Sequence, residues 1–173
     1  ETLFSRLFMP IRDAAQRERK AVDLVARGEA VSIDKAIADA LDAAMLHLVR
    51  NAVAHGIEPE DARRRAGKNP RGSIGVAARQ ESGHIVIEVS DDGGGIDVAR
   101  LRELGIAHGL VPPTISPDDP ALLQLVFAPG ISTSESVGDV AGRGVGGDVA
   151  RRAVERLNGT ITVSSSRGVG TMF

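Results

Sequence analysis

Residues 90–97 read SDDGGGID, and they begin at the last residue of HIVIEVS, residues 84–90, an apolar run with the alternation of a β-strand. Three glycines between a strand and a helix often mark a loop that binds phosphate. Here Asp91 and Asp92 precede the glycines, and carboxylates repel phosphate oxygens. A carboxylate at a strand end can instead accept a hydrogen bond from a neutral donor, such as the amino group of adenine. The alternative interpretation is an acidic turn that caps a helix at Asp97.

The composition is that of one globular domain. The chain has 173 residues, of which 42% are hydrophobic and 25% charged, with a formal net charge of -2. This charge and an aromatic content of 2% argue against nucleic acid as a partner. The lack of cysteine excludes disulfides and thiolate metal sites, and it fits a cytoplasmic location. No apolar run approaches the roughly 18 residues of a membrane span, so no direct membrane insertion is expected. The first residue is Glu1, which suggests a fragment of a longer chain.

The hydrophobic patterns predict a mixture of helices and strands. Helices are expected over 3–17, with Pro10 as a break or restart, over 34–54, with Ser32 or Asp34 as its N-cap, over 97–108 and over 145–159. Strands are expected over 20–26, 73–80, 84–90 and 160–166, and from 171 onward. The second and third strands flank ESG, which predicts an antiparallel hairpin. The pattern favours an α/β (α+β) two-layer sandwich with helices on one face of a mixed sheet.

Residues 111–144 form a long stretch with few regular signals and five of the eight prolines. A loop of this length inside a compact domain is usually a functional lid or disordered. Its only apolar island is ALLQLVF, residues 121–127, which predicts one or two turns of helix.

The stretch MLHLVRNAVAHG, residues 45–56, places a polar ridge on a core helix. His47, Asn51 and His55 are spaced by four residues and therefore share one helical face. Asparagine offers a neutral oxygen to Mg²⁺, and histidine can act as a base, a donor or a phosphate contact. Zinc is not expected, because only two histidines lie on the ridge. The alternative is a solvated helix face.

The stretch GRGVGG, residues 142–147, formally matches the dinucleotide pattern G-x-G-x-x-G. No buried strand precedes it, and the following strand ends in serines instead of an acidic ribose ligand, so a nicotinamide site is not expected. The free N–H groups at the start of a helix still attract phosphate. RGVGT, residues 167–171, is a glycine turn between strands, with an ordinary β-turn as the alternative.

In chain order, the stretches 45–56, 90–97, 142–147 and 167–171 resemble the N, G1, G2 and G3 boxes of the GHKL ATPase superfamily, whose nucleotide-binding module is the Bergerat fold. They most resemble the ATP-binding catalytic domain of the CheA family of chemotaxis histidine kinases. The resemblance is carried by LHLVRNAVAHGIEPEDARRRAGK, DDGGGID, LVFAPGISTSESVGDVAGRGVGGDV and GVGTMF. It implies a leading helix or linker over 1–19, an ATP-binding kinase domain over 20–173, and an ATP lid over about 112–141.

The resemblance also implies roles for matched residues. His47 and Asn51 would be catalytic, with His47 near the γ-phosphate and Asn51 ligating Mg²⁺. Asp91 would bind the adenine amino group, with support from Thr171 through water. The nucleotide-binding set is Asn51, His55, Asp91, Gly93, Gly95, Ile96, Gly142, Arg143, Gly144, Val145, Gly146 and Thr171. Four positions depart from the family pattern, namely Ala54, Leu104, Ile131 and Gly147.

The expected function is transfer of the ATP γ-phosphate to a histidine on a separate phosphoacceptor domain. The expected partners are that domain and a dimerisation domain of the same protein, a response regulator, and a coupling protein with chemoreceptors. Two alternatives remain: an ATP-binding regulatory module with little or no kinase activity, and a GHKL ATPase of another kind.

Overall fold

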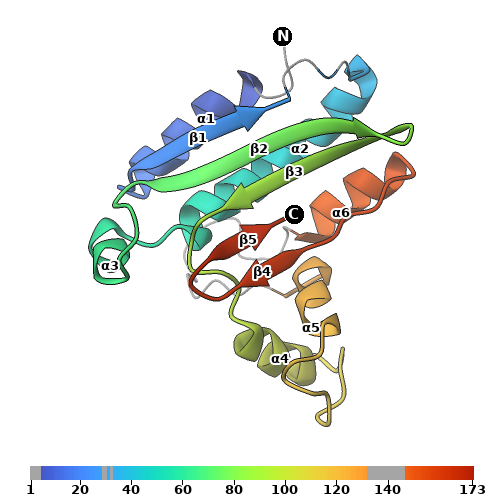
Figure 1. Ribbon diagram of the computed structural model, residues 1–173. Coiled ribbons are helices and arrows are strands. Elements are labelled where there is room, and N and C mark those ends of the chain that lie inside the picture. Colours follow the sequence, from blue (N-terminus) through green and yellow to red (C-terminus); the bar gives the residue numbers. More distant parts are fainter. Residues whose placement is uncertain (1–4, 29–30, 32, 132–146) are drawn as a thin grey trace.

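The computed structural model describes residues 5–28, 31, 33–131 and 147–173 and forms a two-layer α/β sandwich (Figure 1). Its five-stranded sheet has the order β1-β2-β3-β5-β4. The strands are β1 (Val22–Arg27), β2 (Gly72–Glu81), β3 (His84–Asp91), β4 (Ser164–Ser166) and β5 (Gly170–Met172). The helices are α1 (Ser5–Arg17), α2 (Lys35–Asn51), η1 (Ala52–Gly56), α3 (Glu60–Arg65), α4 (Val98–Ala107), α5 (Ala121–Gln124), η2 (Leu125–Phe127) and α6 (Gly147–Arg156).

The sheet is mixed. β2 and β3 form the predicted antiparallel hairpin, whose turn residues Ser82 and Gly83 both have positive φ, as a tight two-residue hairpin turn requires. β5 pairs antiparallel with both β3 and β4. β1 pairs in parallel with β2, and α2 and α3 lie in the connection between them. The predicted mixed sheet is thereby confirmed.

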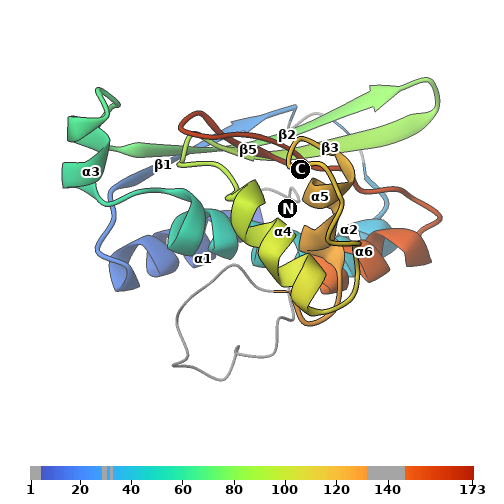
Figure 2. The same cartoon turned by 90° about the horizontal axis from the view of Figure 1, so that it is seen from below.

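α1, α2 and α6 all cover the same face of the sheet, while the other face lacks a helical layer in the described part of the chain (Figure 2). The main core lies between the two layers and includes fully buried Val49 and Val53 from the helical side and Ile74 and Val76 from β2. The alternation of β2 explains this arrangement, since Ile74 and Val76 face the helices while Gly75 and Ala77 face outward. The predicted two-layer sandwich is confirmed.

α1 runs without interruption through Pro10, so the predicted break at that position is wrong. Proline removes one backbone hydrogen bond from a helix. Two anchors on either side of Pro10, Leu7 and Ile11, are buried in the main core, and Arg6 forms ion pairs with Asp39 and Asp42 of α2. Packing of α1 on α2 therefore outweighs the missing bond.

The structure divides the helix predicted over 34–54 into two consecutive helices of different type. Asp34, one of the two N-cap residues that the sequence offered, caps α2 by accepting from the N–H of Ala36. After Asn51 the chain widens into the π-helical turn η1, which closes when the N–H of Ile57 donates to the carbonyl of Ala52. Such turns are frequent at functional sites. The change of helix type falls between two of the predicted site residues, Asn51 and His55.

The strand predicted over 160–166 is regular only at Ser164–Ser166. β4 pairs with β5 in a register that sets Ser164 opposite Met172. In that register the partners of residues 160–162 would lie beyond Phe173, so this segment has no strand opposite it among the described residues. A strand without a neighbour has no ladder hydrogen bonds, which explains the shorter β4.

A second, smaller apolar cluster lies at the end of the molecule formed by α4 and α5. It contains Leu101, Leu122, Leu125 and Ile131, all buried. The predicted helical turns over 121–127 are confirmed as α5 and η2. Phe127 joins this unit to the sheet by an edge-to-face contact with Phe173, whose ring centroid is 6.0 Å away.

Candidate functional site

The end of α2 carries a hydrogen bond between two predicted site residues. The amide nitrogen of Asn51 lies 2.7 Å from Nε2 of His47. An amide nitrogen can only donate, so Nε2 of His47 is the unprotonated acceptor and its proton resides on Nδ1. The amide oxygen of Asn51 makes no hydrogen bond within the described residues. This pair therefore combines a neutral imidazole with a carbonyl-type oxygen that is available to a cation.

Electrostatics also favour neutral histidines at this position. The pKa of His47 is lowered chiefly by burial, while the carboxylate of Asp148 in α6 acts in the opposite direction. The pKa of His55 is lowered by burial and by the charge of Lys20. Lys20 donates to the carbonyls of Val53 and Ala54 at 2.9 and 2.7 Å, which satisfies acceptors in the π-helical turn. This contact was not predicted from the sequence, which placed Lys20 in the strand expected over 20–26, whereas β1 begins at Val22.

These lowered pKa values predict an acid-sensitive fold. In the unfolded chain both imidazoles take up protons near pH 6.5, whereas in the folded chain they remain neutral to lower pH. The unfolded state therefore binds more protons in this window, and the stability falls as the pH decreases through it. We expect the thermal unfolding midpoint to drop between about pH 7.5 and 5.5. The double variant His47→Gln/His55→Gln should lose most of this slope, and an unchanged slope would contradict the assignment.

The π-helical turn delivers Gly56 to Asp91 at the end of β3. A Cβ atom placed on Gly56 would lie 3.1 Å from both Cγ and Oδ2 of Asp91. Oδ1 of Asp91 accepts from the N–H of Gly93 at 2.9 Å. The pKa of Asp91 is raised, mainly by burial, while hydrogen bonds from the backbone of Gly93 and Thr171 oppose the rise. Residues 47–56 therefore connect the His47–Asn51 pair to a half-buried carboxylate.

The other predicted residues of the loop 90–97 and of the G3 turn pack closely together beside Asp91. Gly95 has φ +75°, and a side chain there would overlap the carbonyl of Ser166. The N–H of Ile96 donates to Oγ of Ser165, which lies 3.1 Å from Oγ1 of buried Thr171. Thr171 stands opposite Asp91 in the ladder of β3 and β5. Of these residues, Ser165 was not predicted, because nothing in the sequence distinguishes it from the serines on either side.

Four charged residues support the same loop and were also not predicted. Arg63 of α3 and Lys68, which follows that helix, bond Glu58 and the backbone or side chain of Asp92. Arg63 is only 1% exposed, although it lies in a run of three arginines. A sequence run of like charges gives no indication of which member is buried.

The predicted phosphate-binding residues Gly142, Arg143, Gly144, Val145 and Gly146 lie outside the described residues. α6 starts immediately after them at Gly147 and packs against α2. A Cβ atom on Gly147 would lie 1.9 Å from the carbonyl oxygen of Val126, so the start of α6 is closely packed on η2. Because Asp148 influences the pKa of His47, the N-terminus of α6 lies near the His47–Asn51 pair.

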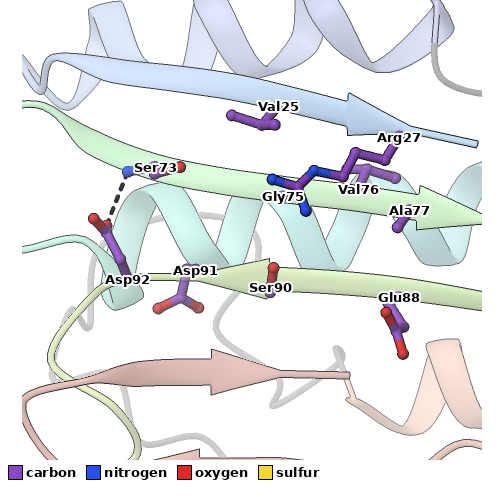
Figure 3. A pocket seen from close by; sticks show the side chains of 10 residues that line it. All are labelled: Val25, Arg27, Ser73, Gly75, Val76, Ala77, Glu88, Ser90, Asp91 and Asp92. Carbon is purple, nitrogen blue, oxygen red and sulfur yellow. Dashed lines mark hydrogen bonds between the residues drawn. The ribbon is translucent and has the colours of Figure 1, made fainter.

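A hollow of about 340 Å³ lies on the outer face of the sheet, over β1, β2 and β3 (Figure 3). Ser73, Gly75 and Ala77 of β2 lie along it, and their small size leaves this space open above the sheet. Asp91 and Asp92 also line this hollow, while Gly56 contacts the carboxylate of Asp91 from the helical side. The hollow therefore borders the predicted site at Asp91.

Two features are absent from the described part of the chain. No described helix combines the length and the apolar character that a bilayer crossing requires. Among the described residues no three histidine, cysteine or carboxylate side chains gather into a metal-binding cluster.

The sequence matches, over residues 36–173, the family model described as histidine kinase-, DNA gyrase B-, and HSP90-like ATPase. It is 42% identical to the chemotaxis protein CheA of Cereibacter sphaeroides and 43% identical to that of Treponema pallidum, over 99% of this chain in each case. It is 37% identical to the sensor histidine kinase CheAY of Helicobacter pylori over 98% of this chain. The chain spans 25%, 21% and 21% of the length of these three relatives.

A solved structure shares the fold. It is the histidine kinase domain of a blue-light activated histidine kinase from Erythrobacter litoralis, with a TM-score of 0.54 and 17% sequence identity. The match covers 99% of this chain and 62% of that chain. At this identity the similarity concerns the fold alone, and it agrees with the mixed sheet and helical layer described above. The chain belongs to the family of histidine kinase-, DNA gyrase B- and HSP90-like ATPases, and its ATPase domain is of the CheA type.

Proposed function

We propose that this chain binds ATP with Mg²⁺ and transfers the γ-phosphate to a histidine on a separate phosphoacceptor domain. Asp91 accepts from the adenine amino group, while Gly93, Gly95, Ile96 and Thr171 shape the pocket around the base. The helix start at 142–146 holds the phosphates. The transfer requires positioning and charge neutralisation more than covalent chemistry by the protein.

The observation that supports this proposal best is the continuity of residues 47–56. At one end Asn51 bonds His47, and at the other Gly56 contacts the carboxylate of Asp91. An adenine base against Asp91 would direct its phosphates along η1 toward Asn51 and the N-terminus of α6. The partial positive charge of that helix end favours phosphate.

The residues fit a magnesium ion that is held together with the nucleotide. Asn51 uses its amide nitrogen for His47 and so turns its oxygen elsewhere. A neutral oxygen is a weak ligand that binds Mg²⁺ appreciably only when phosphate oxygens complete the shell. The ion, when bound, neutralises charge that develops on the transferred phosphoryl group. His47 is neutral and lies one helical turn away, where it can contact the γ-phosphate or accept a proton.

The lid and the partners complete the proposal. We assign the ATP lid to residues 112–141, of which 112–131 include α5 and η2 and the others lie outside the described residues. The leading helix over 1–19 connects to a preceding domain, although Leu7 and Ile11 share the core of the domain over 20–173. The expected partners are phosphoacceptor and dimerisation domains of the same protein, a response regulator, a coupling protein and chemoreceptors, all in the cytoplasm.

Transfer to a supplied acceptor tests the proposal. The chain is mixed with Mg²⁺, labelled ATP and the phosphoacceptor domain of a CheA relative, and the label on that domain is measured over time. An acceptor whose phosphorylated histidine is replaced by glutamine is the control. Label that depends on the acceptor histidine supports the kinase function. Tight ATP binding without transfer would instead favour a regulatory ATP-binding module.

Replacement of the base-reading carboxylate should weaken ATP binding. Asp91→Asn keeps the shape but replaces an ionised acceptor with an amide. Because a charge-assisted hydrogen bond contributes about 1.5–3 kcal/mol, we expect about a tenfold or greater loss of ATP affinity. Calorimetric titration measures it, with Glu88→Gln as the control, since Glu88 lies on the same strand but faces the outer hollow. Near wild-type affinity of a folded Asp91→Asn variant would overturn the base assignment.

A further inference from the structure

We propose that Lys68 and Arg63 are positioning residues of the base-binding site, which fix the direction and the donor strength of the Gly93 N–H that holds Asp91. The inference rests on the proposed role of Asp91 as the adenine acceptor. It assigns a function to the segment between η1 and β2, which the nucleotide site described above does not itself use.

Arg63 is bonded at every donor it has. Nε donates to the carbonyl of Asn69 at 2.7 Å, and Nη1 donates to Glu58 and to the carbonyl of Asp92. Nη2 donates to the carboxylate of Asp92 at 2.8 Å and to the carbonyl of Arg71 at 3.4 Å. A guanidinium has five N–H groups, so its bonding capacity is filled. Such an arrangement fixes Asp92 from both its backbone and its side chain.

Lys68 is bonded in the same complete way. Its ammonium group donates to Oε1 of Glu58 at 2.7 Å, to the carbonyl of Asp92 at 2.8 Å and to the carbonyl of Gly93 at 2.7 Å. An ammonium has three donors, and all three are used. Two cations and two carboxylates balance within this cluster, which reduces the cost of burying them.

The turn after α3 brings the two cations together. The N–H of Lys68 donates to the carbonyl of Arg63 across Gly67, whose φ is +72°. This left-handed glycine ends the helix and reverses the chain. A Cβ atom at Gly67 would meet nothing within 4 Å, so the backbone conformation and not a lack of space calls for glycine there.

The peptide between Asp92 and Gly93 transmits their effect to Asp91. Its carbonyl accepts from both Arg63 and Lys68, and its N–H donates to Oδ1 of Asp91 at 2.9 Å. In a trans peptide these two groups point in opposite directions, so holding the carbonyl aims the N–H. Cations on the carbonyl also polarise the peptide, which makes its N–H a stronger donor.

The charges around Asp91 make this donor important. Burial raises the pKa of Asp91, and the nearby carboxylates of Asp92 and Glu58 raise it further. The Gly93 N–H is the first of the influences that keep it ionised. Arg63 and Lys68 neutralise Glu58 and Asp92 and strengthen that N–H at the same time. Without them, Asp91 would be protonated at higher pH and would point less consistently toward the base.

The decisive variant is Lys68→Met, which keeps most of the length of the side chain and removes its charge. Calorimetric titration measures its affinity for ATP and for inosine triphosphate, which has a carbonyl oxygen where ATP has the amino group. Arg64→Met is the matched control, because Arg64 lies in α3 beside Arg63, its side chain is 60% exposed, and among the described residues it pairs with Glu60 alone. Thermal unfolding checks the fold, and Lys68→Gln serves as a second variant if Lys68→Met does not fold.

We expect Lys68→Met to lose about tenfold in ATP affinity with a smaller loss for inosine triphosphate, so that base selectivity falls. The pH at which ATP affinity is halved should also rise. In the background of Asp91→Asn, the same substitution should change ATP affinity less than about twofold, because interacting sites are non-additive.

Three results would overturn the inference: equal losses for both nucleotides, an unchanged pH profile, or additive losses in the double variant. Each would indicate that Lys68 stabilises the fold without acting on Asp91. A wild-type chain that does not prefer ATP to inosine triphosphate would overturn the base-reading function itself, and the inference with it.

Discussion

Asn51→Ala is expected to lower phosphate transfer to a supplied acceptor domain by at least about 100-fold. The proposed metal ligand is lost, and charge neutralisation by a metal contributes several kcal/mol to such reactions. Every 1.36 kcal/mol corresponds to about tenfold in rate. The substitution also removes the donor that holds Nε2 of His47 at 2.7 Å, so the imidazole loses its orientation. Rapid-quench measurement of labelled acceptor gives the rate, and calorimetry gives the accompanying loss of Mg²⁺–ATP affinity.

His47→Gln is the informative companion variant. Glutamine retains polarity but cannot act as a base, so ATP binding should persist while the transfer rate falls. Mg²⁺ should bind appreciably only when nucleotide is present, because Asn51 offers a single neutral oxygen. If Asn51→Ala transfers phosphate at the wild-type rate, the metal and kinase assignments of this helix are wrong.

Sequence reasoning identified the features that are local to one segment. The hairpin of β2 and β3 follows from alternation and a short turn, and the cap at Asp34 follows from residue type. The resemblance of residues 45–56 and 90–97 to known boxes proposed two parts of the candidate site. The structure brings these parts together, since Gly56 contacts Asp91.

The features that were missed depend on contacts between distant segments. The parallel pairing of β1 with β2 joins Val22 to Gly72, across a connection that no local pattern specifies. The burial of Arg63 depends on Asp92, which lies 29 residues further along the chain. Lys20 reaches η1 across more than thirty residues. Pro10 shows the converse case. Proline usually interrupts a helix, but the packing of α1 on α2 outweighs this local preference.

Gly93→Ala should damage the site severely, whereas Gly94→Ala should be almost silent. A Cβ atom on Gly93 would lie 2.0 Å from the carbonyl oxygen of Gly56 and 2.9 Å from Oδ1 of Asp91. The obstacle at Gly56 is backbone and cannot rotate away. The loop must therefore withdraw by about 1 Å to reach the 3.0 Å below which real Cβ contacts are essentially never found. On Gly94 the nearest atoms belong to Glu58 at 3.8 Å, which is an ordinary contact.

The two alanines differ by one position in the same loop, and neither glycine has the positive φ that would add backbone strain. A misplacement of about 1 Å in a catalytic site can cost on the order of 100-fold in rate. We therefore expect Gly93→Ala to lose about that factor in phosphate transfer, with weakened ATP binding, while Gly94→Ala remains within about twofold of wild type. Equal behaviour of the two variants would mean that the contact between η1 and the loop does not set the geometry of Asp91. The unfolding midpoint of each variant, measured alongside, separates displacement of the loop from loss of the fold, because only the latter would also remove the main core between the sheet and α2.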